Sequence, residues 1–281
     1  MRRLGGIEAG GTKFVCAVGT GPGDLVRTVL PTGRPEETVG QAIEWFRAQG
    51  ELEAVGIASF GPVEIDPASP QWGYITSSPK PGWRDFDFAG AVQAALGVPV
   101  AFDTDVNAAL RAEARWGAAR DVLSCIYLTV GTGIGGGAFA CGQMLNGVSH
   151  PEMGHIRVPH DRAADPFEGC CPFHGNCLEG LASGPAIAAR WGMRGEALPD
   201  DHPAWALEAE YLAHGLASLS CILSPDRILL GGGVMQRRHL FPRIRTRVCE
   251  LLAGYVRMPG ILPPALGPDA GILGAISLAK R

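Results

Sequence analysis

The densest group of potential metal ligands in the chain is Cys171-x-x-His174-x-x-Cys177, with His155 shortly before it. A structural zinc ion takes all four of its tetrahedral nitrogen or sulfur ligands from the protein, whereas a catalytic zinc ion keeps one position open. The tight spacing supplies three ligands, and His155 can complete the set. We therefore predict a structural zinc site within a zinc-binding loop that covers residues 151–180.

Two further features of this loop bear on its chemistry. Cys170 could replace Cys171 as a ligand, but Pro172 stiffens the loop after Cys171 and favours the latter. The alternative, a set of free surface thiols, is disfavoured because exposed cysteine clusters oxidise readily. Glu152 and Glu179 flank the ligands, so we expect them to contact the hydroxyl groups of a polyol substrate. As isolated surface glutamates they would have no such role.

Three glycine-rich segments have the composition of phosphate-binding turns: a first glycine turn, Gly10-Gly11-Thr12-Lys13, a second glycine turn, Gly131-Thr132-Gly133, and a third glycine run, Gly231-Gly232-Gly233. In the first two, backbone N–H groups and a threonine hydroxyl can cradle phosphates. Either turn alone would more simply be a tight hairpin. The third run lies between an expected strand and helix, where adenosine or phosphate commonly docks. Together the three segments favour a bound nucleotide.

Two familiar nucleotide motifs match only in part. Residues 131–136 fit the dinucleotide pattern G-x-G-x-x-G, with Glu152 further on, but residues 137–142 are expected to return as a strand instead of opening a helix. In the first glycine turn Thr12 precedes Lys13 and no helix follows, so the P-loop pattern also fails. We therefore reject a dehydrogenase and a P-loop enzyme.

A candidate catalytic base lies in Asp103-Thr104-Asp105-Val106-Asn107, between an expected strand and an expected helix. Asp103, Thr104 and Asp105 are all good helix caps, yet one helix needs only one cap. The remaining carboxylate and the Asn107 amide therefore fit a ligand site. A carboxylate at a helix N-terminus stays ionised and is a weak base, which phosphoryl transfer tolerates. We predict Asp105 as the base, with Asp103 capping the helix or holding Asp105 and a metal-bound water.

The elements that must position these residues form two α/β halves. In the first half we expect strands at 4–10, 13–18, 54–59 and 99–102 and helices at 35–49, 86–96 and 105–116, with an irregular segment at 62–82. In the second half we expect strands at 125–130, 138–141 and 227–230, a turn at 131–137, and helices at 203–223, after 233 and at 270–279. Each half opens with a strand, a glycine turn and a strand.

This repetition predicts a duplicated α/β fold of two lobes with a central cleft. We expect a smaller lobe at 1–116, on which the C-terminal segment 270–281 packs back, and a larger lobe at 117–269. The net charge of −4 argues against a nucleic-acid partner. No apolar run reaches the roughly 18 residues that span a bilayer, and glycines interrupt the N-terminus before a signal-like core. We therefore expect a cytoplasmic protein with no membrane contact.

At this point the chain resembles a known family, the ROK (repressor, open reading frame, kinase) sugar kinases. The resemblance rests on motifs in the same order, at 8–13, 103–107, 131–137 and 152–155 and in the Cys/His loop. Segments 56–63 and 73–83 are similar in particular to the bacterial fructokinase branch. Family repressors carry an additional N-terminal DNA-binding domain, which we do not expect here because the first hairpin starts at residue 4.

This resemblance implies an actin-like ATPase (ribonuclease H-like) fold that uses ATP and Mg²⁺ and binds Zn²⁺. It implies transfer of the γ-phosphoryl group to the 6-hydroxyl of fructose, giving fructose 6-phosphate, by a homodimer. Asp105 is then the base, and His155 both binds zinc and supports the sugar. Glu152 and Glu179 contact sugar hydroxyls, and Asn107 belongs to the same hexose site.

Two positions depart from the family pattern. Glu8 stands where many members have aspartate, which leaves the metal-water contact of the first glycine turn open. Pro79 stands where many glucose-specific members have asparagine, which favours fructose over glucose. A mannokinase or broad-specificity hexokinase is the nearest alternative. A catalytically silent sugar-binding protein is another, although Asp105, Asn107 and two intact glycine turns speak against it.

Overall fold

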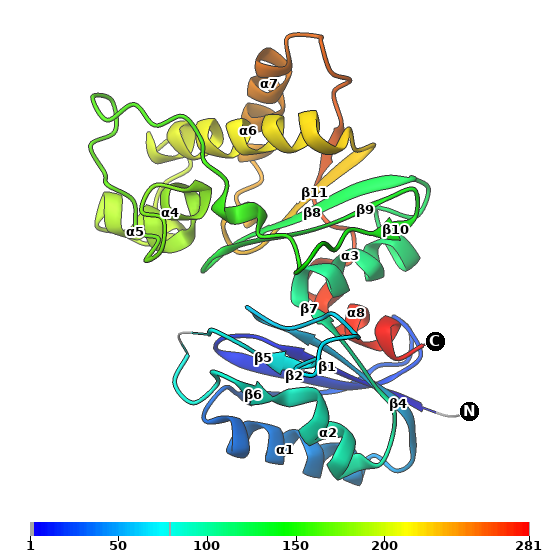
Figure 1. Ribbon diagram of the computed structural model, residues 1–281. Coiled ribbons are helices and arrows are strands. Elements are labelled where there is room, and N and C mark those ends of the chain that lie inside the picture. The colour runs from blue at the N-terminus through cyan, green and yellow to red at the C-terminus, as the bar shows by residue number, and fades with distance from the viewer. Residues whose placement is uncertain (1–2, 79, 281) are drawn as a thin grey trace. The chain divides into compact units, whose positions relative to one another are not determined.

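A computed structural model describes residues 3–78 and 80–280, so the prediction for Pro79 lies outside the described residues (Figure 1). The chain divides into two compact units. Unit 1 takes the described residues of Met1–Arg120, Asn146–His150 and Ala265–Arg281. Unit 2 takes Asp121–Leu145 and Pro151–Pro264. The short segment 146–150 thus belongs to unit 1, although unit 2 precedes and follows it in the sequence.

The sheet of unit 1 has the strand order β3-β2-β1-β4-β7. Its strands are β1 (Arg3–Ala9), β2 (Lys13–Gly19), β3 (Val26–Pro31), β4 (Leu52–Ser59) and β7 (Val100–Thr104). The strands β1, β2 and β3 pair antiparallel, and β4 and β7 continue the sheet parallel to β1. A small second sheet pairs β5 (Tyr74–Ile75) with β6 (Phe86–Asp87). The main sheet is therefore mixed.

Helices cover both faces of this sheet. The helices α1 (Pro35–Ala48) and α2 (Phe88–Leu96) lie on one face, and α3 (Asp105–Trp116) and α8 (Ala270–Ala279) lie on the other (Figure 1). A 3₁₀ turn, η4 (Gly267–Asp269), leads into α8. A Cβ on Gly56 would lie 1.9 Å from the carbonyl oxygen of Ala275. The strand β4 and the helix α8 therefore approach at a distance that only glycine permits.

The sheet of unit 2 has the order β10-β9-β8-β11-β12, which repeats the order and directions of the first. Its strands are β8 (Ser124–Val130), β9 (Ile134–Ala140), β10 (Gln143–Met144), β11 (Arg227–Gly231) and β12 (Gly260–Leu262). The helices of this unit are α4 (Leu178–Ala182), α5 (Gly184–Trp191), α6 (Ala204–Leu223) and α7 (Leu240–Leu252). The shorter 3₁₀ turns are η1 (Met153–His155), η2 (Gly195–Ala197) and η3 (Val234–Gln236). The duplicated α/β plan expected from the sequence is thus confirmed.

Several expected boundaries differ from the structure. We expected a turn over 131–137, but β9 begins at Ile134, because Gly135, Gly136 and Gly137 pair with residues of β8. The helix expected directly after Gly233 is the 3₁₀ turn η3, and α7 starts only at Leu240. The strand β3 and the helices α4 and α5 were not predicted from the sequence. None of the helices in the described part of the chain is both long and apolar enough to cross a bilayer.

Candidate functional site

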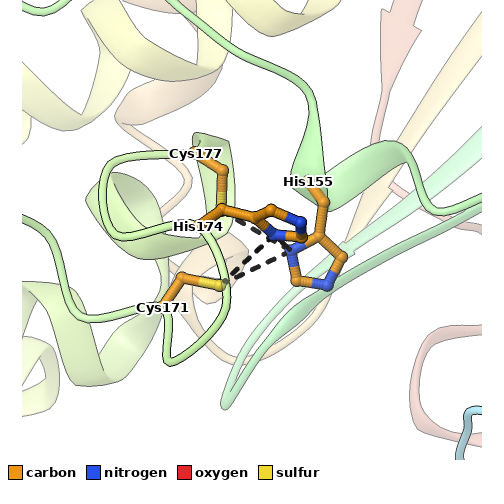
Figure 2. Close-up of side chains that lie close together, drawn as sticks. All are labelled: His155, Cys171, His174 and Cys177. Atoms are coloured by element: carbon orange, nitrogen blue, oxygen red, sulfur yellow. Dashed lines mark hydrogen bonds between the residues drawn. The ribbon is translucent and has the colours of Figure 1, made fainter.

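Four side chains of unit 2 converge on one point, His155, Cys171, His174 and Cys177 (Figure 2). Their potential ligand atoms all lie within 4.8 Å of one another. His155 ends the turn η1, and Cys177 caps α4, where its Sγ accepts a 3.4 Å hydrogen bond from the N–H of Gly180. The turn between Cys171 and Gly175 closes with backbone hydrogen bonds in both directions. The local hydrogen bonds therefore hold the four donors together.

The distances between donor atoms can be tested against a zinc tetrahedron. Zinc–sulfur and zinc–nitrogen bonds of about 2.3 and 2.0 Å give tetrahedral edges of about 3.3–3.8 Å. His155 Nδ1 lies 3.3 Å from His174 Nδ1 and 3.5 Å from Cys177 Sγ. Cys171 Sγ lies 3.7 Å from the Nδ1 atom of each histidine. Both the chemistry of the donors and their spacing fit a zinc ion.

The Cys177 side chain of this group is buried, which affects the protonation of its thiol. Burial raises the pKa of the Cys177 thiol to about 11, while the hydrogen bond from Gly180 acts in the opposite direction. Coordination to a metal would stabilise the thiolate that burial disfavours. Cys170 is exposed, and its Sγ lies 4.0 Å from Ser183 Oγ instead of beside the other donors. The structure thus places Cys171, and not Cys170, in the group of four.

A chain of hydrogen bonds leads from this group to the interior of unit 2. Arg157 Nη1 donates to the carbonyl oxygen of His174 and to Asn176 Oδ1, both at 2.7 Å. Asn176 Nδ2 lies 3.2 Å from His160 Nδ1, and His160 Nε2 lies 3.0 Å from the carbonyl oxygen of Asp165. A carbonyl only accepts, so His160 donates from Nε2 and accepts at Nδ1. Every donor in this chain therefore faces an acceptor.

The Asp165 carboxylate anchors the inner end of this chain. It is buried and accepts hydrogen bonds from Tyr211 Oη at 2.5 Å and from Arg190 Nε at 3.2 Å. Although burial acts to raise the pKa of Asp165, these two partners and the N–H of Phe167 hold it below its ordinary value. Arg157, His160 and Asp165 were not predicted from the sequence, because the residues that join them, Asn176, Arg190 and Tyr211, lie 16 or more positions away.

The candidate base lies in unit 1, at the carboxyl end of β7. Asp105 is the first residue of α3, which Thr104 caps by accepting a 3.1 Å hydrogen bond from the N–H of Asn107. Of the three possible caps, the structure therefore selects Thr104. Asp105 is half-buried, and its Oδ1 accepts a 2.9 Å hydrogen bond from the N–H of Val106. Its carboxylate is thus held at the start of the helix.

Glu8 lies close enough to Asp105 for their charges to interact. Burial, and next the negative charge of Asp105, raise the pKa of Glu8 to about 7, while Lys13 acts in the opposite direction. A Cβ on Gly271 would come within 2.4 Å of the Glu8 carboxyl group, and the N–H of Ile272 donates to that group. Glu8 is therefore packed against the first turn of α8.

The first glycine turn closes with a 2.9 Å hydrogen bond from Gly10 N to the carbonyl oxygen of Lys13. Gly11, Thr12 and Lys13 are exposed. Lys80 Nζ donates to the carbonyl oxygen of Gly11, a contact between distant parts of the chain that the sequence analysis did not anticipate. The turn is thus fixed by its carbonyl groups while its residues remain accessible.

The second glycine turn borders a cavity of about 770 Å³ in unit 2. Gly131, Thr132 and Gly233 are among its lining residues. Gly231 and Gly232 do not line it: a Cβ on Gly231 would meet the Tyr127 hydroxyl at 2.6 Å, and one on Gly232 the backbone of Val130 at 2.3 Å. Of the third glycine run, only Gly233 therefore faces this cavity, and the other two glycines allow close packing on β8.

Arg237 also lines this cavity and contacts several of its other residues. Its guanidinium donates to the carbonyl oxygens of Gly195 at 3.0 Å and Glu196 at 2.7 Å, and to Asp200 Oδ1 at 2.8 Å. It also lies 5.4 Å from the ring centroid of Trp205, within cation–π range. The segment around η2 is thereby tied to η3, and both border the cavity.

The two glutamates predicted to contact a polyol differ in their surroundings. The Glu152 side chain is half-exposed, and its Oε2 lies 3.8 Å from His155 Nε2. Glu179 Oε2 accepts a 2.8 Å hydrogen bond from the N–H of Ile134, at the end of the second glycine turn. Asn107 is fully buried and donates to Asp103 Oδ1 at 2.7 Å. These contacts were not evident from the sequence.

Comparison with known proteins gives the family of the chain. A protein-family sequence model, described as the ROK family, matches residues 4–281. The chain belongs to the ROK family. Its curated relatives include a Bacillus subtilis protein that is 48% identical over 99% of this chain and 95% of its own length. Fructokinases from Pediococcus pentosaceus and Zymomonas mobilis are each 43% identical over at least 98% of this chain and 95% of their own lengths.

Solved structures of other ROK proteins share the fold over the whole chain. A ROK hexokinase from Thermus thermophilus has a TM-score of 0.81 and 29% identity, covering 99% of this chain and 98% of its own. A ROK family glucokinase from Streptomyces griseus, in complex with glucose and AMPPNP, has a TM-score of 0.79 and 27% identity, covering 99% of both chains. The actin-like ATPase fold predicted from the sequence is thereby confirmed.

Proposed function

We propose that this ROK protein is an ATP-dependent fructokinase, which transfers the γ-phosphoryl group of ATP to the 6-hydroxyl of D-fructose. The observation that carries the proposal is its 43% identity to two fructokinases over nearly the full length of each chain. The ROK glucokinase from Streptomyces griseus, aligned over the same length, reaches 27%. The similarity thus favours fructose over glucose as the substrate.

In this proposal Asp105 accepts the proton of the attacking hydroxyl group, because it is a carboxylate fixed at a helix N-terminus. Asp103, Asn107 and Arg111 hold the strand end from which α3 starts. Asn107 is fully buried, so it serves the hexose site by fixing Asp103. Phosphoryl transfer requires positioning and charge stabilisation more than covalent chemistry.

Each glycine turn offers groups that can bind phosphate oxygens. The first turn offers the Thr12 hydroxyl, the Lys13 ammonium group and the backbone N–H of Gly11, while its Gly10 N–H closes the turn. The second offers Thr132 and the N–H of Gly133, beside the cavity that would hold the rest of the nucleotide. When bound, Mg²⁺ would neutralise phosphate charge in this chemistry.

The sugar would be held by Glu152, His155 and Glu179, in and beside the zinc-binding loop. His155, Cys171, His174 and Cys177 would hold Zn²⁺, whose contribution is structural because the protein fills all four positions. The proposal includes a cytoplasmic homodimer.

A broader hexokinase or a mannokinase is the second candidate. It is favoured by the Thermus thermophilus ROK hexokinase, which has 29% identity and a TM-score of 0.81. A silent sugar-binding protein would retain the fold without turnover. These alternatives differ in which sugar, if any, supports ADP release.

The test is ADP release from Mg-ATP with D-fructose, D-mannose, D-glucose or no sugar. A coupled assay that consumes fructose 6-phosphate but not fructose 1-phosphate identifies the hydroxyl that reacts. We expect the highest kcat/KM with fructose. Preferred turnover of another hexose would overturn the substrate assignment, and the absence of any sugar-dependent turnover in folded protein would overturn the kinase.

A further inference from the structure

The helix that follows a metal ligand lies against the second glycine turn. Cys177 caps α4, and Glu179, two residues later, accepts a 2.8 Å hydrogen bond from the N–H of Ile134. A Cβ on Gly133 would lie 2.7 Å from Glu179 Oε2. The carboxylate is therefore in direct contact with the turn, in space that a larger residue at position 133 would occupy.

The same segment makes a second contact with this turn. The N–H of Gly184, at the start of α5, donates a 2.7 Å hydrogen bond to the carbonyl oxygen of Gly131. Ser183 N donates to the carbonyl oxygen of Glu179 at 3.1 Å, and the Ser183 side chain caps α5. The segment from Cys177 to Gly184 thus contacts both ends of the turn, through Gly184 at Gly131 and through Glu179 at Ile134.

The two residues before His155, another of the four candidate ligands, pack on β9, the strand that follows the turn. A Cβ on Gly154 would lie 1.8 Å from the carbonyl oxygen of Ile134. The side chain of Met153 lies within 2.7 Å of the position that a Cβ would take on Gly136. Both of these contacts require glycine, so the fit is close on this side as well.

The hydrogen bonds also determine which donors of the turn remain for a ligand. Gly131 N donates to the carbonyl oxygen of Gly133 at 2.9 Å, and Ile134 N donates to Glu179. Within residues 3–78 and 80–280, the N–H groups of Thr132 and Gly133 have no hydrogen-bond acceptor. Glu179 therefore fixes the peptide next to the two N–H groups that are left for phosphate oxygens.

We infer that Glu179 is a positioning residue for the nucleotide, through which the metal-binding segment holds the second glycine turn in its phosphate-binding conformation. This inference rests on the proposed ATP site and gives Glu179 a role beyond contact with the sugar. A hydrogen bond from an N–H group to an ionised carboxylate is stronger than a neutral one. A glycine-rich turn loses much conformational entropy when ordered, so a turn that is fixed in advance binds more tightly.

The experiment measures AMPPNP binding by calorimetry in the absence of sugar. Glu179→Ala removes the acceptor, and we expect about a tenfold weaker affinity, since hydrogen bonds to charged groups typically contribute about that much. Glu179→Gln keeps a carbonyl oxygen that can accept from Ile134, so its affinity should stay within about threefold of the wild type. Glu168→Ala is the matched control, because Glu168 is an exposed carboxylate of the same loop.

Amide hydrogen exchange provides a second readout that a sugar contact would not change. We expect faster exchange at Ile134 in Glu179→Ala and in chelator-treated wild type, but not in Glu168→Ala. Zinc content and circular dichroism of each variant report whether the loop and the fold are retained. Unchanged AMPPNP affinity in Glu179→Ala, or unchanged exchange at Ile134, overturns the inference. Nucleotide binding by the wild type without fructose turnover overturns the fructokinase proposal alone.

Discussion

The side-chain nitrogen of Asn107 donates a 2.7 Å hydrogen bond to Oδ1 of Asp103. Asp103 is buried at the end of β7, and its Oδ2 lies 3.4 Å from Arg111 Nε, one turn further along α3. The Asp103 carboxylate therefore links the end of β7 to α3 through these two contacts. Asp105, two residues later, is half-buried and is the first residue of α3, and it is the carboxylate that we propose as the base.

Replacement of Asp105 tests its role as the base. Asp105→Asn should fold normally, since Thr104 caps α3, but kcat should fall by about a hundred- to ten-thousandfold. Steady-state kinetics with fructose and circular dichroism provide the measurement. Asp201→Asn, at an exposed position, is the control. Near-normal turnover in Asp105→Asn would remove Asp105 as the base.

Glu8 should make stability depend on pH. Burial and the charge of Asp105 raise its pKa from 4.5 to about 7. The folded state thus favours the protonated carboxyl group, so this stabilisation is complete below pH 4.5 and is lost as the pH rises through 7. In the wild type the free energy of unfolding should therefore fall by up to about 3 kcal/mol over this pH range, and Glu8→Gln should remove this fall. Urea unfolding of both proteins between pH 4 and 8 is the measurement, and parallel curves would contradict the prediction.

The four-residue donor group predicts one zinc ion per chain. Cys177→Ser should lose most of the bound zinc and lower the melting temperature, because the loop between residues 155 and 177 would lose its cross-link. Cys249→Ser is the matched control, since Cys249 is an exposed free cysteine far from the group in sequence. Elemental analysis and calorimetry give the two readouts. Equal zinc contents in the two variants would argue against this metal centre.

The hydrogen-bond chain from Arg157 to Asp165 should determine how tightly zinc is held. Asn176→Leu removes the contacts to Arg157 and His160 while leaving all four ligands. Outer partners of metal ligands typically contribute about 10- to 100-fold in affinity, so zinc should bind that much more weakly. Competition with a chromophoric chelator measures this change. Arg162→Gln, which breaks an exposed ion pair with Glu168, should leave the affinity unaltered.

Arg237 should affect nucleotide binding more than turnover. In Arg237→Met the hydrogen bonds to Gly195, Glu196 and Asp200 are lost, so the KM for ATP should rise about tenfold with little change in kcat. Arg237→Lys should restore part of this loss. Arg243→Met, at an exposed position on α7, serves as the control. A fall in kcat at constant KM would show that this wall acts on the reaction itself.

Much of the candidate site could be predicted because its chemistry is local. The helix α3 was expected at 105–116 and lies there, since a run of capping residues marks its start and an amphipathic pattern follows. The spacing of Cys171, His174 and Cys177 indicated a metal centre for the same reason. Such signals depend on neighbours within a few residues, which a sequence displays directly.

The boundaries that failed are those that pairing with a distant strand decides. Gly135 to Gly137 have low strand propensity, yet they belong to β9 because their backbone groups pair with β8. The third glycine run depends on distant residues in the same way: Gly233 lines the cavity, whereas a Cβ on Gly231 would meet Tyr127 and one on Gly232 would meet Val130, both in β8.

The sequence by itself determined the family, the duplicated α/β plan and the four side chains that could hold a metal ion. Only the tertiary structure showed which side chains support the candidate site: Arg237 lines the cavity, Asp165 anchors the hydrogen-bond chain behind the four donors, and Glu179 contacts the second glycine turn. The partners are far apart in the sequence: Arg237 and Asp200 by 37 positions, Asp165 and Tyr211 by 46, and Glu179 and Ile134 by 45. Such partners come within hydrogen-bonding distance only when the chain folds, because neither residue type nor local spacing indicates which distant residues will be in contact.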